Sequence, residues 1–225
     1  MLAFLCGIYL ALLNAPTEKA HELDVSKTSS VPPALPYSDA IGAERKHVHT
    51  IGIIVAGGKS RRMGSDKAAI LYKNKSLLDH AIDLLALFGV KETIVLGRPG
   101  HAHGVADPLL GAGPAANIVA WINGLYQSGS KSARTREPLR LVILPVDMPL
   151  LSIEQLQVLN KHKKGGYFDD LYLPLVATVD RPISCSGPRM KDLLAALKIE
   201  PVTAPTTWQP ALKNFNSIAD LEALN

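Results

Sequence analysis

The feature that most constrains the fold is the regular alternation of short apolar runs with longer segments of helical periodicity. Residues 51–56, IGIIVA, form a nearly continuous run rich in β-branched residues, which is typical of a strand covered on both faces. Segment 76–90 then places its apolar residues on one stripe at helical spacing. Further strands are predicted at 92–97, 139–146 and 170–178, and further helices at 113–126, 152–164, 187–198 and 217–224. This alternation predicts an α/β fold, a three-layer sandwich in which right-handed crossovers build a mainly parallel sheet with helices on both faces.

Several residues predict where these elements begin or end. Ser76 and Ser152 are candidate caps for the helices that follow them, and Ser217 with Asp220 has the spacing of a capping box. The fourth predicted strand contains Pro174. Because proline cannot donate a hydrogen bond to a neighbouring strand, that strand is predicted to lie at the edge of the sheet or to carry a bulge.

The first fifty residues have a different character from the rest of the chain. Residues 1–13, MLAFLCGIYLALL, are apolar but shorter than the roughly 20 residues of a membrane-spanning helix. Their length fits a secretory signal, although no Lys or Arg precedes the run; a poorly ordered extension or an upstream start is the alternative interpretation. Residues 14–50 are rich in Pro, Ser and charge and show no sustained period. We therefore expect an N-terminal extension over 1–50 and one domain over 51–225.

Composition excludes several classes of protein. Hydrophobic residues make up 47% of the chain and charged residues 20%, as in ordinary globular proteins. The net charge of +4 suits anionic ligands, but no basic stripe is interleaved with aromatic residues, so nucleic acid is not predicted as a partner. Cys6 and Cys185 lie far apart and predict neither a disulfide framework nor a cysteine metal site. The cytoplasm is the expected compartment.

The loop after the first predicted strand, GGKSRRMGSDK, has the composition of a phosphate-binding segment. Gly57 and Gly58 allow positive φ and a close approach of the backbone to a ligand, and four basic residues follow within the loop. In parallel sheets ligands bind at the carboxyl ends of the strands, so a nucleoside triphosphate is the expected ligand. The loop matches neither Walker A nor the dinucleotide fingerprint G-x-G-x-x-G. The alternative is a tight turn whose basic side chains are solvated.

A carboxylate is expected at the same edge. Asp147 directly follows the apolar strand 139–146, between Pro145 and Pro149. Such a residue can help to hold a metal ion beside bound phosphate. It can instead cap the next helix, but Ser152 is better placed for capping, so the metal interpretation is preferred.

These residues resemble a known family. The run VAGGKSRRMGSDK, residues 55–67, is similar to the signature L-A-G-G-x-x-x-R-M-G-x-D-K of molybdenum cofactor guanylyltransferases, the MobA proteins, within the wider Rossmann-like nucleotidyltransferases. Three later segments resemble further motifs of the family in the same order: ADPLLGAGP (106–114), LPVDMP (144–149) and NFNSIADL (214–221). The resemblance covers residues 51–225.

The resemblance implies a magnesium-dependent nucleotidyltransferase that transfers GMP from GTP to a molybdopterin-type cofactor and releases pyrophosphate. The implied catalytic residues are Arg61, Arg62, Lys67 and Asp147, with Asp147 as the Mg²⁺ ligand. The implied nucleotide-binding residues are Val55, Ala56, Gly57, Gly58, Lys67, Asp107 and Asp147. Asp107 also fits a plain Asp-Pro turn. Contacts with a molybdoenzyme or a cofactor carrier are further implied partners.

Some positions depart from the family pattern. The family often has Gly-Pro-Leu-Ala-Gly where residues 113–117 read GPAAN, and an Asn where the second predicted strand ends in Leu-Gly-Arg. Residues 198–213 are short and Pro-rich where relatives carry a more basic segment on the acceptor side. A CTP-using or sugar-phosphate nucleotidyltransferase of the same fold and a non-catalytic nucleotide-binding protein therefore stay open as alternatives.

Overall fold

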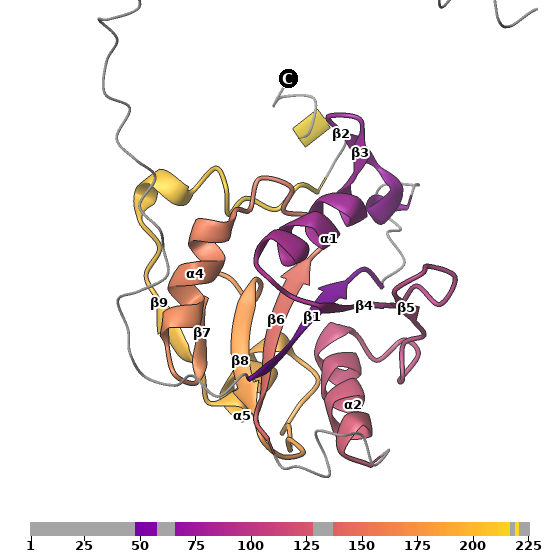
Figure 1. Ribbon diagram of the computed structural model, residues 1–225, viewed down its shortest axis with the longest axis vertical. Helices are drawn as coiled ribbons and strands as arrows, with labels where there is room; N and C mark the ends of the chain where they lie inside the picture. Colours follow the sequence, from indigo (N-terminus) through magenta and orange to yellow (C-terminus); the bar gives the residue numbers. More distant parts are fainter. Residues whose placement is uncertain (1–47, 58–65, 128–136, 217–218, 221–225) are drawn as a thin grey trace, which may run out of the picture. The chain divides into compact units, whose positions relative to one another are not determined.

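The computed structural model describes residues 48–57, 66–127, 137–216 and 219–220 (Figure 1). Its strands are β1 (His49–Val55), β2 (Leu71–Tyr72), β3 (Lys75–Ser76), β4 (Glu92–Leu96), β5 (Gly104–Val105), β6 (Leu139–Pro145), β7 (Gly165–Phe168), β8 (Leu175–Val179) and β9 (Glu200–Val202). Its helices are α1 (Leu77–Leu87), α2 (Pro114–Gln127), α4 (Ile153–Lys161) and α5 (Met190–Leu197), with short 3-10 turns η1 (Lys67–Ala69) and η2 (Thr206–Trp208). None of the helices in these ranges combines the length and the apolar character needed to cross a membrane.

Seven of the strands form one sheet in the order β5-β4-β1-β6-β8-β7-β9. β1 pairs in parallel with β4 on one side and β6 on the other, and β4 pairs in parallel with β5. β8 runs antiparallel to both of its neighbours, β6 and β7, whereas β9 is parallel to β7. One reversed strand thus interrupts an otherwise parallel sheet among the described strands. The predicted mainly parallel sheet is confirmed.

Helices cover both faces of the sheet and bury two separate cores (Figure 1). α1 and α4 pack on one face, against alternate residues of β6 such as Val142 and Leu144. α2 and α5 pack on the other face, against the intervening residues Leu141 and Ile143. Because every second side chain of a strand points to the opposite face, a strand buried on both sides must be apolar throughout, as the sequence of β6 is. The predicted three-layer sandwich is confirmed.

The predicted helix starts are also found where the structure describes them. The Ser76 hydroxyl accepts a hydrogen bond of 3.0 Å from the backbone N–H of Asp79 and caps α1. Ser152 begins α4, and its backbone N–H donates to the Gln155 side chain at 2.8 Å, as in a capping box. Ser217 lies outside the described residues, so the cap predicted there stays a prediction.

Predictions were less accurate beyond α4. The strand predicted at 170–178 begins only at Leu175, after Pro174, and β8 lies inside the sheet between β6 and β7. The prediction of an edge strand was therefore wrong, because Pro174 precedes the strand and removes none of its hydrogen bonds. The helix predicted to reach residue 164 ends at Lys161. β7 and β9 were not predicted, since they are short and rich in Gly or Pro.

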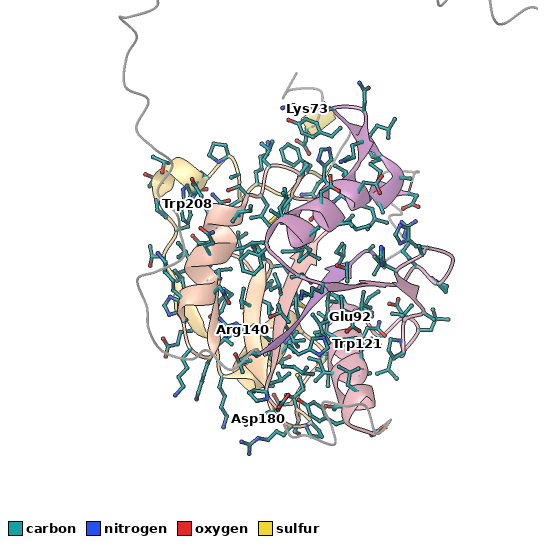
Figure 2. The ribbon with its side chains drawn as sticks, in the orientation of Figure 1. Lys73, Glu92, Trp121, Arg140, Asp180 and Trp208 are labelled. Atoms are coloured by element: carbon teal, nitrogen blue, oxygen red, sulfur yellow. The ribbon has the colours of Figure 1, made fainter. Side chains whose placement is uncertain are left out.

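A buried arginine links the start of β6 to the end of α4. Arg140 is 9% exposed, and its guanidinium donates to the carbonyl oxygens of Asn160 and His162 at 2.9 Å and of Lys163 at 3.1 Å. It also donates to the side chains of Asn160 and Thr178. Burial lowers the pKa of Arg140, because desolvation disfavours the charged form. Figure 2 shows Arg140 toward the end of the sheet opposite to the arrowheads of β1 and β6, so it serves the fold and lies away from the predicted site.

Replacing Arg140 by methionine is expected to lower the free energy of unfolding by about 3 kcal/mol, because several buried carbonyl groups lose a charged donor. Arg140→Lys keeps the charge but lacks the several N–H donors of the planar guanidinium. It is expected to lower the free energy of unfolding by a smaller amount. Chemical denaturation followed by circular dichroism measures both changes. Arg181→Met, at a side chain that is 78% exposed, is the matched control and should leave the unfolding midpoint in place. Equal midpoints for Arg140→Met and the control would contradict the structural role.

Candidate active site

The carboxyl ends of β4, β1 and β6 meet at one edge of the sheet. Val55, the last residue of β1, lies opposite Leu96 of β4 and opposite Pro145 of β6. The loops that leave these three strands therefore start side by side, and Figure 1 shows the arrowheads of β1 and β6 pointing to the same end of the sheet. This is the edge at which parallel sheets bind ligands.

A lysine and an aspartate from two of these loops meet at this edge. The Lys67 Nζ lies 2.7 Å from Oδ2 of Asp147, although the two residues are 80 positions apart in sequence. The side chains are 18% and 20% exposed, so both can reach a ligand from a largely shielded position. Lys67 is the first residue of η1, and Asp147 follows the end of β6. The structure thus brings together two predicted site residues; their catalytic roles stay predictions.

The closing segment of the chain completes this cluster. Lys67 also donates to Oδ1 of Asn216 at 3.2 Å. The neighbouring Phe215 is 1% exposed, and its backbone N–H donates to the carbonyl oxygen of Asp147 at 2.9 Å. The backbone N–H of Asn216 in turn donates to Asp220 at 3.0 Å. Asn216 was not predicted as a site residue, although the motif NFNSIADL that contains it stood out in the sequence.

Glycines and a second aspartate lie at the end of β1. A Cβ atom placed on Gly57 would come within 2.9 Å of Oδ2 of Asp107, so the carboxylate of Asp107 lies directly against the Gly57 backbone. Gly97 has a φ of +84°, and a Cβ there would be 2.4 Å from the Cα of Gly57. Only glycines can approach each other so closely. The structure therefore places Val55, Ala56, Gly57 and Asp107 close together at the end of β1, and their role in nucleotide binding stays a prediction. The other predicted residues of this loop, Gly58, Arg61 and Arg62, lie outside the described residues.

The departure from the family pattern at residue 117 has a structural explanation. Asn117 lies in α2 and is 4% exposed. Its side chain accepts a hydrogen bond of 2.7 Å from the backbone N–H of Leu109 and donates one of 3.0 Å to the carbonyl oxygen of Gly113. Asn117 therefore holds the loop that follows Asp107 against the start of α2.

The donor chemistry at Asp147 fits magnesium. Mg²⁺ is commonly held by one or two carboxylates together with substrate phosphates and waters, and Asp147 offers a partly exposed carboxylate at the strand edge. Among the residues that the structure describes, no three His, Cys, Asp or Glu side chains form a group that could hold a metal ion. A single carboxylate is sufficient where substrate phosphates supply the other oxygens.

A pocket opens farther along the same edge. It lies at the carboxyl end of β7 and is lined by residues 168–171 together with Thr203, Ala204, Gln209 and Leu212. β8 alone separates β7 from β6. With about 4.8 Å between neighbouring strands, β7 lies roughly 10 Å from β6, the strand that Asp147 follows.

Comparison with known proteins identifies the family of the chain. Residues 52–222 match the profile of the MobA-like NTP transferase domain. The chain is 34% identical over 180 residues to the molybdenum cofactor guanylyltransferase of Xanthomonas euvesicatoria, with 74% of this chain and 89% of the relative covered. It is 31% identical to the molybdenum cofactor guanylyltransferase of Acidiphilium cryptum, with 78% and 93% covered.

Solved structures agree on the fold. A nucleotidyl transferase from Methanothermobacter thermautotrophicus superimposes with a TM-score of 0.51 at 15% identity, covering 78% of this chain and 95% of that one. The protein Rv0371c of Mycobacterium tuberculosis gives a TM-score of 0.53 at 14% identity, covering 79% and 97%. The match of residues 52–222 to this profile, together with the 34% identical relative, shows that this chain belongs to the MobA-like NTP transferase family.

Proposed function

We propose that the protein transfers GMP from GTP to a molybdopterin-type cofactor and releases pyrophosphate. The observation that carries the proposal is the contact between Lys67 and Asp147 at the edge where β1 and β6 end, in a chain whose relatives are molybdenum cofactor guanylyltransferases. It joins a cation for phosphate and a carboxylate for Mg²⁺ at one edge of the sheet.

In this proposal the triphosphate lies over the ends of β1 and β4. The backbone around Gly57 and Gly97 lets phosphate or ribose approach closely, and Asp107 can accept hydrogen bonds from ribose or base. Lys67 provides a point charge for the phosphates. Arg61 and Arg62 are proposed to add charge from the same loop. Asp147 would hold Mg²⁺, which neutralises charge on the phosphates when it is bound.

The acceptor is proposed to bind on the other side of Asp147, toward β8 and β7. The pocket at the end of β7 lies on that side and offers apolar and polar side chains together. This arrangement would bring donor and acceptor together from opposite sides of Asp147. It also gives the short segment 198–213 a part in the acceptor side, since this segment supplies one wall of the pocket.

The transfer is a substitution at the α-phosphorus of GTP. An oxygen of the acceptor phosphate forms a new bond to this phosphorus, the bond from the α-phosphorus to the bridging oxygen breaks, and pyrophosphate leaves with that electron pair. The acceptor phosphate is already ionised at neutral pH, so the protein needs no strong general base. Its contribution is to position the two substrates and to stabilise charge, as is usual in phosphoryl transfer.

The test is a set of parallel incubations with Mg²⁺. Pyrophosphate and a guanine dinucleotide form of the cofactor are expected only when GTP and molybdopterin are both present, and mass spectrometry identifies the product. Product formed from CTP in place of GTP, or with a sugar phosphate in place of molybdopterin, would assign another nucleotidyltransferase activity. GTP binding without pyrophosphate from any pair would point to a non-catalytic nucleotide-binding protein.

A further inference from the structure

An arginine from the loop after β4 contacts both ends of the predicted triphosphate loop. The Nε of Arg98 donates to the carbonyl oxygen of Ala56 at 3.4 Å. Its two terminal nitrogens donate to the two carboxylate oxygens of Asp66, which forms a bidentate ion pair. Ala56 precedes Gly57, and Asp66 precedes Lys67. One side chain therefore joins the point where this loop leaves β1 to the point where it enters η1.

The backbone around Arg98 is itself held in place. The N–H groups of Gly97 and Arg98 both donate to the carbonyl oxygen of Val105, at 3.0 and 3.2 Å. Gly97 adopts a φ of +84° and packs against the backbone of Gly57. Arg98 therefore starts from a fixed position when it reaches toward Ala56 and Asp66.

The contact extends from Asp66 to the proposed catalytic pair. Oδ1 of Asp66 accepts a hydrogen bond of 3.2 Å from the backbone N–H of Ala68 and so caps η1. Lys67, the first residue of η1, lies between these two residues and contacts Asp147 at 2.7 Å. Any movement of Asp66 would therefore displace the backbone that carries Lys67.

We infer that Arg98 is a positioning residue that ties the two ends of segment 57–66 together and holds Lys67 opposite Asp147. Its guanidinium is engaged by Asp66 and Ala56, so it acts through the loop and does not serve as a ligand of the triphosphate. Such preorganisation lowers the cost of fixing Lys67 in its working position when substrate binds. The inference rests on the proposed function only for the catalytic role of Lys67. The structural link between Arg98 and η1 does not depend on the proposed function.

The first test needs no substrate. Hydrogen exchange of the peptide that contains Ala68 and Ala69 is measured in the wild-type protein, Arg98→Ala and Arg98→Lys. Arg98→Ala is expected to speed exchange by about tenfold, because η1 loses the support of its capping residue. Arg98→Lys keeps the charge but cannot form the bidentate pair, so its exchange rate should be close to that of the alanine variant. Exchange as slow as in the wild type in both variants would overturn the inference.

The second test is a double-mutant cycle with transfer activity. Arg98→Ala and Asp66→Ala are each expected to lower kcat/KM by about 10- to 100-fold, and the double variant should be no worse than either alone, since residues that act as one unit are not additive. Fully additive losses, or a raised KM for GTP in Arg98→Ala alone, would show that Arg98 contacts the substrate directly.

A matched control separates this effect from a general loss of charge. Arg181 forms an ion pair of 2.9 Å with Asp180, and Figure 2 shows Asp180 at the far end of the sheet from the arrowheads of β1 and β6. Arg181→Ala should change neither the exchange of η1 nor kcat/KM. If the protein shows no GMP transfer with any acceptor, the proposed function fails, while the exchange measurement still decides the role of Arg98.

Discussion

Replacing Asp147 by asparagine is expected to lower the turnover of GMP transfer by about a thousandfold, because the amide cannot neutralise Mg²⁺ and binds it poorly. The substitution keeps the shape of the side chain. The backbone carbonyl that accepts from Phe215 also stays in place, so the fold around the site should persist. In the proposed function the nucleotide lies over the loops after β1 and β4, so the dissociation constant for GTP should rise by no more than about tenfold.

Steady-state kinetics measure the turnover, and calorimetry measures the dissociation constant for GTP, so the two effects are obtained separately. Asp180→Asn, at a carboxylate remote from the strand edge that carries Asp147, is the matched control and should leave both unchanged. A fully active Asp147→Asn variant would remove the carboxylate from the mechanism, and with it the proposed magnesium site.

Replacing Lys67 by methionine is expected to lower turnover by about a hundredfold, since the leaving pyrophosphate loses a nearby positive charge. The structure also predicts that the same substitution increases the affinity for a divalent cation. Because the Lys67 ammonium lies 2.7 Å from Oδ2 of Asp147, it competes with a divalent cation for this carboxylate in the nucleotide-free protein. Lys67→Met should therefore bind Mn²⁺ more tightly than the wild type when no nucleotide is present, which electron paramagnetic resonance can measure.

Lys75 offers a matched control for this pair. It forms an ion pair with Asp83 on an exposed surface. Lys75→Met should change neither Mn²⁺ binding nor turnover. Unchanged Mn²⁺ affinity in Lys67→Met, together with normal turnover, would mean that the contact with Asp147 is only structural.

The parts of the fold that could be predicted from the sequence are those with a clear period. β1 and β6 are largely apolar runs, β4 is a short strand rich in β-branched residues, and α1, α2, α4 and α5 show helical stripes, so their type and order were predicted correctly. The two-residue strands β2, β3 and β5 are too short to show a period. β7 begins with two glycines and β9 contains a proline, so neither resembles a strand by composition.

The contacts of the candidate site also differ in whether they could be predicted from the sequence. The proximity of Lys67 and Asp147 could be expected, because loops from neighbouring parallel strands leave the sheet at one edge. The ion pair between Arg98 and Asp66 was not predicted, because the shared edge brings their loops together but does not determine which side chains pair. Asn216 depends on how the last segment docks beside β6, which no local pattern determines.

The reversed direction of β8 has a consequence for how relatives of this protein can diverge. Because β7 and β8 are antiparallel neighbours, residues 169–174 join them as a simple hairpin at the edge where Asp147 lies. A parallel pair would need a dozen or more residues and usually a helix to return the chain. The loop of this hairpin can change its length and composition without shifting β1, β4, β6 or the helices that pack on them. In the proposed function, in which this connection lines the acceptor pocket, a new acceptor could be adopted by remodelling one short segment while the strands that carry the nucleotide loops keep their places.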